Sequence, residues 1–242
     1  MFLRLVWVDV GGVRRCRAVP LHAHSSRRAG SDCRAVLELN RSRKFLHHTS
    51  RLALVCFFLP CYGDDAVVPG AWERGDVILL PAPGPAIKLP GSCDWLAMAS
   101  IHVDGPARTP YPWCPRALLY GSCERLRREF GVRMNVGFET EFVLLDAETR
   151  RGLESSVYCQ TSGFDFAAEV LREMTSALHA CGQTVLHVHG ESAPGQFEIV
   201  TSHSDDVMGQ ADAFVVRKEV IQRVARKHGL LASFLPKIWA AQ

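Results

Sequence analysis

Four glutamates stand in two apolar, strand-like segments of the sequence. Glu139 and Glu141 belong to the segment G-F-E-T-E-F-V-L-L, and Glu191 and Glu198 belong to H-G-E-S-A-P-G-Q-F-E-I-V. Ionised carboxylates are seldom kept in such surroundings unless an opposite charge neutralises them. A hard divalent cation supplies that charge, so the pattern indicates a metal site that is built from oxygen ligands.

Glu139 and Glu141 are separated by one residue, so in a strand both side chains point to the same face. A rise of about 3.3 Å per residue places their backbones about 6.6 Å apart. Oxygen ligands without a histidine–cysteine cluster favour Mg²⁺ or Mn²⁺ over zinc. For one such pair alone, acids on the solvent side of an edge strand are the alternative. A second acidic pair on a neighbouring strand argues against that alternative.

Glu191 and Glu198 flank a turn at Pro194-Gly195 and can therefore lie across a hairpin from each other. Gly195 permits tight backbone curvature at this turn. Gln196 offers an uncharged hydrogen-bonding partner to the acids.

Two histidines, His187 and His189, precede this turn and alternate with apolar residues. They could be metal ligands on one face of a strand. Since no partner that would fix their tautomers is evident, we favour histidines with satisfied hydrogen bonds beside a polar cavity.

The composition is that of an ordinary globular protein, with 48% hydrophobic and 22% charged residues. The net charge of +3 is too small to indicate nucleic acid, so we expect no nucleic-acid partner. The most apolar run, residues 52–62, is shorter than the roughly 20 residues of a membrane-spanning helix, so we expect no membrane span. The nine cysteines include no C-x-x-C pair, which indicates reduced, mostly buried thiols and a cytoplasmic protein.

In the first half of the chain, strand patterns alternate with segments that lack periodicity. Residues 1–20 predict a hairpin around a primed turn at Gly11-Gly12, and residues 76–80 and 95–103 predict two further strands. We expect an irregular insertion at about residues 22–62. Four prolines between residues 106 and 115 mark a domain boundary.

The second half has stronger patterns. Pro115 and Gly131 bound a helix, at the first and last positions that these residue types favour. The other predicted elements are helices at residues 164–181 and 205–228 and strands at residues 132–145, 185–188, 196–201 and 230–235. We expect a mainly antiparallel sheet that is backed by the two later helices.

Three motifs in this order resemble glutamine synthetase: G-F-E-T-E-F at residues 137–142, E-S-A-P-G-Q-F-E-I at 191–199 and A-R-K-H-G-L-L-A-S-F-L-P-K at 225–237. The nearest likeness is to the class I-type domain of FluG and nodulin-like proteins, and it is strong over about residues 111–237. The resemblance implies an α+β fold. A small β-grasp-like domain at residues 1–105 would precede the N-terminal part of the catalytic domain at residues 111–242.

The resemblance also implies a reaction. Enzymes of this family use ATP to convert glutamate to γ-glutamyl phosphate, and ammonia then displaces the phosphate to form glutamine. The implied partners are glutamate, ammonia and ATP, with Mg²⁺ or Mn²⁺ as the cofactor. The implied assembly is a homo-oligomer in the cytoplasm that serves nitrogen assimilation.

Site residues carry over only where the motifs match. Glu141, Glu191 and Glu198 would hold a first ion, which orients the substrate glutamate, and Glu139 would belong to a second ion beside ATP. Glu141 and Glu191 would thereby also serve substrate binding, and Glu191 would face the ammonium pocket as a catalytic residue. Tyr158 would be a second catalytic residue near that pocket, and an ordinary buried aromatic residue is its alternative.

Some family features have no counterpart in this sequence. The family continues after Pro236-Lys237 with a glycine-rich segment, a histidine ligand of the second ion and later arginines, so the resemblance predicts a C-terminal truncation. Leu186 stands where the family has an acid, and Asp64 and Asp65 are candidates for an ammonium-binding aspartate. Removing one preorganised charge commonly lowers turnover by about 10²–10³.

Three interpretations follow. The first is an ATP-dependent glutamate–ammonia ligase. The second is a non-catalytic fragment or pseudo-subunit that retains a divalent-metal site, and for this chain alone we favour it. The third is a generic α/β binding domain without metals, in which case the likeness would be accidental.

Overall fold

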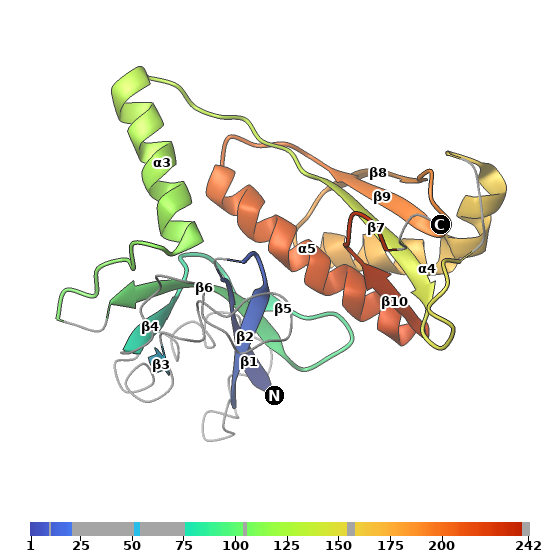
Figure 1. Ribbon diagram of the computed structural model, residues 1–242, viewed down its shortest axis with the longest axis horizontal. Helices are drawn as coiled ribbons and strands as arrows, with labels where there is room; N and C mark the ends of the chain where they lie inside the picture. Colours follow the sequence, from blue (N-terminus) through green and yellow to red (C-terminus); the bar gives the residue numbers. More distant parts are fainter. Residues whose placement is uncertain (10, 21–50, 54–75, 104–105, 154–157, 239–242) are drawn as a thin grey trace. The chain divides into compact units, whose positions relative to one another are not determined.

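The computed structural model describes residues 1–9, 11–20, 51–53, 76–103, 106–153 and 158–238. The chain divides into two units, Met1–Arg133 and Met134–Gln242, whose helices and strands are labelled in Figure 1. Both units contain a β-sheet and at least one helix, so the predicted α+β class is confirmed. The predicted domains, residues 1–105 and 111–242, remain a prediction.

The first unit contains a six-stranded sheet with the order β2-β1-β6-β4-β3, and a short β5 also pairs with β6. Parallel pairing joins β1 to β6, and the other pairs are antiparallel. Alternate residues such as Leu3, Leu5 and Trp7 are buried in the core of this unit. The strands are β1 (Phe2–Val8), β2 (Arg14–Pro20), β3 (Arg51–Ala53), β4 (Asp76–Pro81), β5 (Ile87–Lys88) and β6 (Trp95–Val103).

The hairpin of β1 and β2 is confirmed, but the expected two-residue turn at Gly11-Gly12 is wrong. The backbone N–H of Asp9 donates to the Val13 carbonyl at 3.0 Å, so the loop is longer than two residues. The buried Asp9 carboxylate accepts hydrogen bonds from the N–H groups of Gly11 and Val13. A side-chain acceptor therefore closes this loop, which a rule based on glycine pairs cannot anticipate.

The predicted strands at residues 76–80 and 95–103 are confirmed as β4 and β6. Part of the expected irregular insertion is instead strand, because β3 pairs antiparallel with β4. The expectation is therefore wrong at residues 51–53. The rest of that insertion, with Asp64 and Asp65, lies outside the described residues.

The predicted helix is confirmed as α3 (Pro115–Phe130). Proline stands in its first turn, and Gly131 adopts a left-handed backbone with φ of 66° at its end. None of its residues is buried. Arg125 and Arg127 pair with glutamates of the same helix, so its basic cluster is a solvated face.

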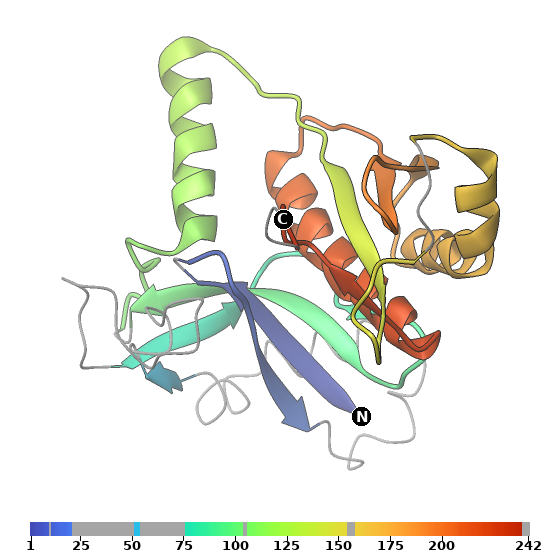
Figure 2. The same cartoon turned by 45° about the vertical axis from the view of Figure 1, so that its right-hand side comes forward.

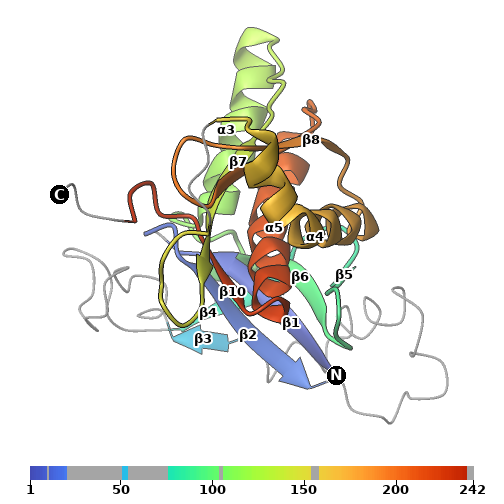
Figure 3. The same cartoon turned by 90° about the vertical axis from the view of Figure 1, so that its right-hand side faces the viewer.

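The second unit is a four-stranded antiparallel sheet with the order β10-β7-β9-β8. Two helices, α4 and α5, lie side by side against one face of it (Figures 1 and 2), and Figure 3 shows them from the side. Phe142, Leu144 and Ile199 are buried by this packing. The elements are β7 (Glu139–Asp146), α4 (Thr161–Ala180), β8 (Val185–Gly190), β9 (Gln196–Thr201), α5 (Val207–Lys227) and β10 (Leu230–Ser233).

The strand predicted at residues 132–145 is shorter than expected. Pairing between β7 and β9 starts at Glu139 opposite Val200, and an isolated bridge between Val136 and Ser204 lies beyond it. Because β9 ends at Thr201, the chain before Glu139 has no continuous partner strand. The other predicted elements of this unit are confirmed, with ends shifted by up to three residues.

Six described cysteines are free thiols, and one of them, Cys114, is buried. The expectation of mostly buried thiols is therefore wrong for the described cysteines. Cys16, for example, lies on the exposed side of β2. Among the described residues, no helix combines the length and apolarity that a membrane span requires.

Candidate metal centre

Glu141, Glu198 and His189 form one row across three neighbouring strands. The register places Glu141 of β7 opposite Glu198 of β9, and Glu198 opposite His189 of β8. Directly opposed residues of antiparallel strands lie on the same face of a sheet. Thr140, the neighbour of Glu141, is buried and bonds to α5, so the row lies on the face that the helices leave open.

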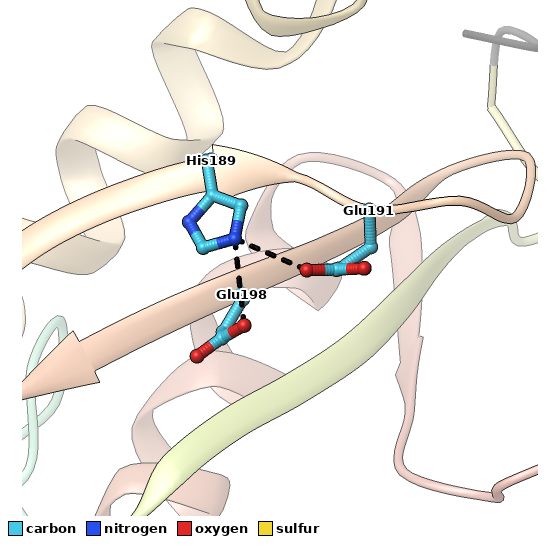
Figure 4. A group of neighbouring side chains, drawn as sticks. All are labelled: His189, Glu191 and Glu198. Carbon is cyan, nitrogen blue, oxygen red and sulfur yellow. Dashed lines mark hydrogen bonds and ion pairs between the residues drawn. The ribbon is translucent and has the colours of Figure 1, made fainter. Parts of the chain in front are cut away.

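Glu191 joins this row from the end of β8 (Figure 4). The Nε2 atom of His189 lies 3.1 Å from Glu191 Oε1 and 3.4 Å from Glu198 Oε2. One ligand atom from each of these three residues lies within 4.8 Å of the others. His189, rather than Glu191, is the residue directly opposite Glu198, so the two glutamates face each other diagonally across the hairpin.

The turn between β8 and β9 is set by Gly195, whose φ is +71°. A Cβ atom there would lie 2.5 Å from the Leu144 carbonyl oxygen, so the position is closed to other residues. The Gln196 side chain donates to Glu141 Oε2 at 2.7 Å and accepts from the backbone N–H of Ala193 at 3.0 Å. The predicted partner role of Gln196 is confirmed, because this side chain joins the turn to Glu141.

Glu198 is the most buried of the four glutamates, with 6% of its surface exposed. Burial raises the pKa of its carboxyl group, and the charges of Glu139, Glu191 and Glu141 raise it further, whereas His189 lowers it. The four predicted carboxylates therefore act on one another across two strands and a turn. Clustered carboxylates beside an imidazole are a donor set that fits a divalent cation.

Glu139 and Glu141 also line a cavity of about 450 Å³ within the second unit. Lys218 of α5 lies at this cavity, with its Nζ atom 4.2 Å from the ring centre of Phe214 and 5.2 Å from that of Phe234. Residues 233–238 form another wall. A volume of this order accommodates a small organic molecule next to the two carboxylates.

Tyr158 lies at the edge of the cluster and packs edge to face against His189, with ring centres 5.6 Å apart. It is 58% exposed, which contradicts the alternative of an ordinary buried aromatic residue. The adjacent Cys159 thiol raises the pKa of the Tyr158 hydroxyl, and the charges of Glu191 and Glu198 raise it further. The tyrosine is thus close to the carboxylates, and its catalytic role remains a prediction.

Sequence reasoning favoured His187 and His189 as histidines with satisfied hydrogen bonds. His189 does contact two carboxylates, but the same contacts make it a member of the ligand-capable cluster. His187 stacks on His189, with ring centres 5.6 Å apart. The alternation of the two histidines with apolar residues is the sequence signal that both lie on one face of β8. Only the register with β9 shows that His189, and not His187, lies opposite a glutamate.

Two residues of α5 near the site were not anticipated, Arg217 and Lys218. Arg217 is 1% exposed and lies on the same helix face as the buried Val220 and Ile221. An arginine within the apolar stripe of a helix is a pattern that indicates a buried cation, and the sequence contains this pattern.

Fold and site together define an α+β protein with clustered carboxylates and an imidazole that could hold a divalent cation. The chain belongs to the glutamine synthetase family, because residues 112–242 match the family described as "Glutamine synthetase, catalytic domain". Family membership supports a ligase-type function in general.

Individual relatives agree with this assignment. The chain is 23% identical to type-1 glutamine synthetase 1 of Dictyostelium discoideum over 98% of its own length and 48% of that protein. It is 31% identical to a glutamine synthetase of Methanocaldococcus jannaschii, over 68% of its length and 38% of that protein. A solved GmaS/ADP complex has a similar fold, with a TM-score of 0.76 and 23% identity over 99% of this chain and 50% of that one. The chain thus spans about half the length of the first of these relatives, and less of the second.

Proposed function

We propose that this protein carries a divalent-cation site of the glutamine synthetase type and acts in the ATP-dependent joining of glutamate and ammonia. The observation that carries this proposal is the row of Glu141, Glu198 and His189 with Glu191 beside it. Like charges that are placed directly opposite each other need a compensating charge, and none of the contacts within the row supplies a permanent one.

Each glutamate has a role in the proposal. Glu141, Glu191 and Glu198 hold a first Mg²⁺ or Mn²⁺ ion, and Glu139 contributes to a second. When bound, such ions offset the charge of transferring phosphoryl groups and orient the substrates. Gln196 fixes the orientation of the Glu141 carboxylate through its 2.7 Å hydrogen bond.

The proposed substrate roles follow the family resemblance. Glu141 and Glu191 serve the glutamate site, and Glu191 with Tyr158 borders the ammonium site. The cavity beside Glu139 is available to the nucleotide or to the glutamate, and the similar GmaS structure is an ADP complex. We further propose that the protein forms a homo-oligomer and lies in the cytoplasm.

A second candidate is a protein that binds the cation without catalysing the reaction. It is favoured by the ligand count, because Glu139 is the one described carboxylate that the family resemblance assigns to the second ion. Phosphoryl transfer needs this ion to neutralise the phosphates. The two candidates share the first metal site and differ in turnover.

A coupled assay separates the candidates. Purified protein receives ATP, Mg²⁺, glutamate and ammonia, and phosphate release is followed with each component omitted in turn. Release that requires both glutamate and ammonia, and that is lost in Glu141→Gln but kept in the surface control Glu129→Gln, supports the ligase. Mn²⁺ binding without such release supports the second candidate, and the absence of both overturns the proposal.

A further inference from the structure

Arg217 of α5 is a fully buried cation, and its three hydrogen bonds all go to neutral oxygens. Its Nε atom donates to Gln183 Oε1 at 3.0 Å, and its Nη1 atom donates to the Phe138 carbonyl at 3.0 Å and to Thr140 Oγ1 at 2.7 Å. In the described parts of the chain, no carboxylate oxygen lies within ion-pairing distance of this guanidinium. Burial lowers the pKa of Arg217 to about 10, so it stays charged at neutral pH.

A buried charge with neutral partners needs a reason, because removing a guanidinium from water is unfavourable. Two of the three acceptors, in Phe138 and Thr140, flank Glu139 in the sequence. Phe138 precedes it, and Thr140 separates it from Glu141. Since neighbouring residues of a strand point to opposite faces, holding Thr140 on the helix side directs both glutamates to the open face.

The start of β7 is the part of the strand that most needs such support. β10 pairs with residues 143–146 of β7, and β9 pairs with residues 139–143. Residues 139–142 therefore have one neighbouring strand in the described structure, which is β9. Arg217 bonds to this singly paired stretch from the helix below it. Gln183, which accepts the hydrogen bond from Arg217 Nε, is itself fixed, because its side chain donates to the Ala213 carbonyl of α5 at 3.0 Å.

We propose that Arg217 is a positioning residue, whose planar guanidinium holds the first residues of β7 so that Glu139 and Glu141 face the metal centre. The proposal rests on the function proposed above for those two glutamates. A guanidinium donates in several fixed directions at once, which the ammonium group of lysine cannot reproduce. The geometry, more than the charge, is therefore the property that matters.

Two measurements test this role in Arg217→Met and Arg217→Lys. Mn²⁺ affinity is measured by titration with electron paramagnetic resonance, which detects the free ion. We expect Arg217→Met to weaken Mn²⁺ binding by about tenfold or more, as for other residues that orient ligands, and Arg217→Lys to be intermediate. Val224→Ala, a buried change on the same helix away from these bonds, is the matched control and keeps the affinity of the original chain.

Hydrogen exchange provides a readout that does not depend on metal. We expect amides 139–142 to exchange faster in Arg217→Lys, while amides 143–146, which β10 also covers, keep their protection. If Arg217→Met fails to fold, Thr140→Val removes one of the three bonds and is measured in the same way. Unchanged Mn²⁺ affinity and unchanged exchange in the folded variants would overturn the proposal. If the original chain binds no Mn²⁺, the proposed function fails, and the exchange result alone decides on Arg217.

Discussion

Glu141 and Glu198 lie directly opposite each other on adjacent antiparallel strands. Like charges in this arrangement usually destabilise a sheet by a few tenths of a kcal/mol up to about 1 kcal/mol. Burial raises the pKa of Glu198, and the negative charges of Glu139 and Glu191 close to it raise this pKa further. This arrangement of carboxylates destabilises the metal-free protein and becomes favourable when a cation binds. The stability of the folded protein should therefore depend on the metal ion.

Mn²⁺ should therefore stabilise the protein through this site. At a concentration 100 times its dissociation constant, a ligand of the native state contributes about 2.7 kcal/mol. We expect a rise in melting temperature with Mn²⁺ that is lost in Glu141→Ala and Glu198→Ala and kept in Glu129→Gln on α3. Thermal unfolding with and without Mn²⁺ measures this rise, and equal melting temperatures in both conditions would contradict the metal site.

Without metal, Glu198→Gln should stabilise the protein at neutral pH. The pKa of Glu198 is raised in the folded state, so the native protein binds more protons than the unfolded chain, and the free energy of unfolding falls as the pH rises through these pKa values. We expect Glu198→Gln to gain between a few tenths and about 1 kcal/mol at pH 7, the cost of directly opposed like charges.

Urea unfolding in a chelator measures this gain between pH 7 and about pH 4. The advantage of Glu198→Gln should shrink towards the acid end, where the wild-type carboxyl group is also neutral. A variant that is less stable than the original chain at pH 7 would show that the contact with His189 outweighs the repulsion.

Gly195 should tolerate no side chain. An alanine there adopts an unfavourable left-handed backbone, which costs roughly 1–2 kcal/mol, and its Cβ would also collide with the Leu144 carbonyl and the Leu153 amide. Gly182 has a similar φ of +77° with open space around it, so Gly182→Ala is the matched control. We expect Gly195→Ala to lose clearly more stability than Gly182→Ala in urea unfolding. Equal losses would mean that the turn relaxes and the collision is avoided.

Glu173 of α4 holds the end of α5 through two contacts, with Lys227 at 2.7 Å and His228 at 2.8 Å. The hydrogen bond from Lys227 lowers the pKa of Glu173 most, followed by that from His228. A carboxyl group with a lowered pKa contributes stability above its unfolded pKa, and this contribution disappears as the pH falls through the folded pKa.

We therefore expect Glu173→Gln to lose stability at pH 7. The loss should stay below about 1 kcal/mol, because the carboxylate is one third exposed and solvent screens the pair. Urea unfolding at pH 7 and at about pH 3.5 should show the difference vanish in acid. Glu124→Gln on the exposed α3 is the comparison, and a loss that persists in acid would point to packing rather than charge.

Several parts of this structure could be predicted from local pattern. The three helices in the described part of the chain follow from their bounding residues, such as Pro115 and Gly131 of α3. The alternation around Thr140 predicted that Glu139 and Glu141 share a face, and the turn at Gly195 predicted the hairpin. Where the prediction failed, the missing information was long-range. β7 begins only at Glu139 because β9 supplies no partner before that point, and β3 exists because β4 lies beside it.

The sequence by itself determined the residue types of the site, since acids at strand spacing within apolar segments and the ordered family motifs are written in the chain. Only the tertiary structure decided which of them meet. Strand register places His189, and not Glu191, opposite Glu198, and the packing of α5 under β7 brings Arg217 to the first residues of that strand. Register and helix packing join residues that are distant in sequence, so local spacing carries no record of them.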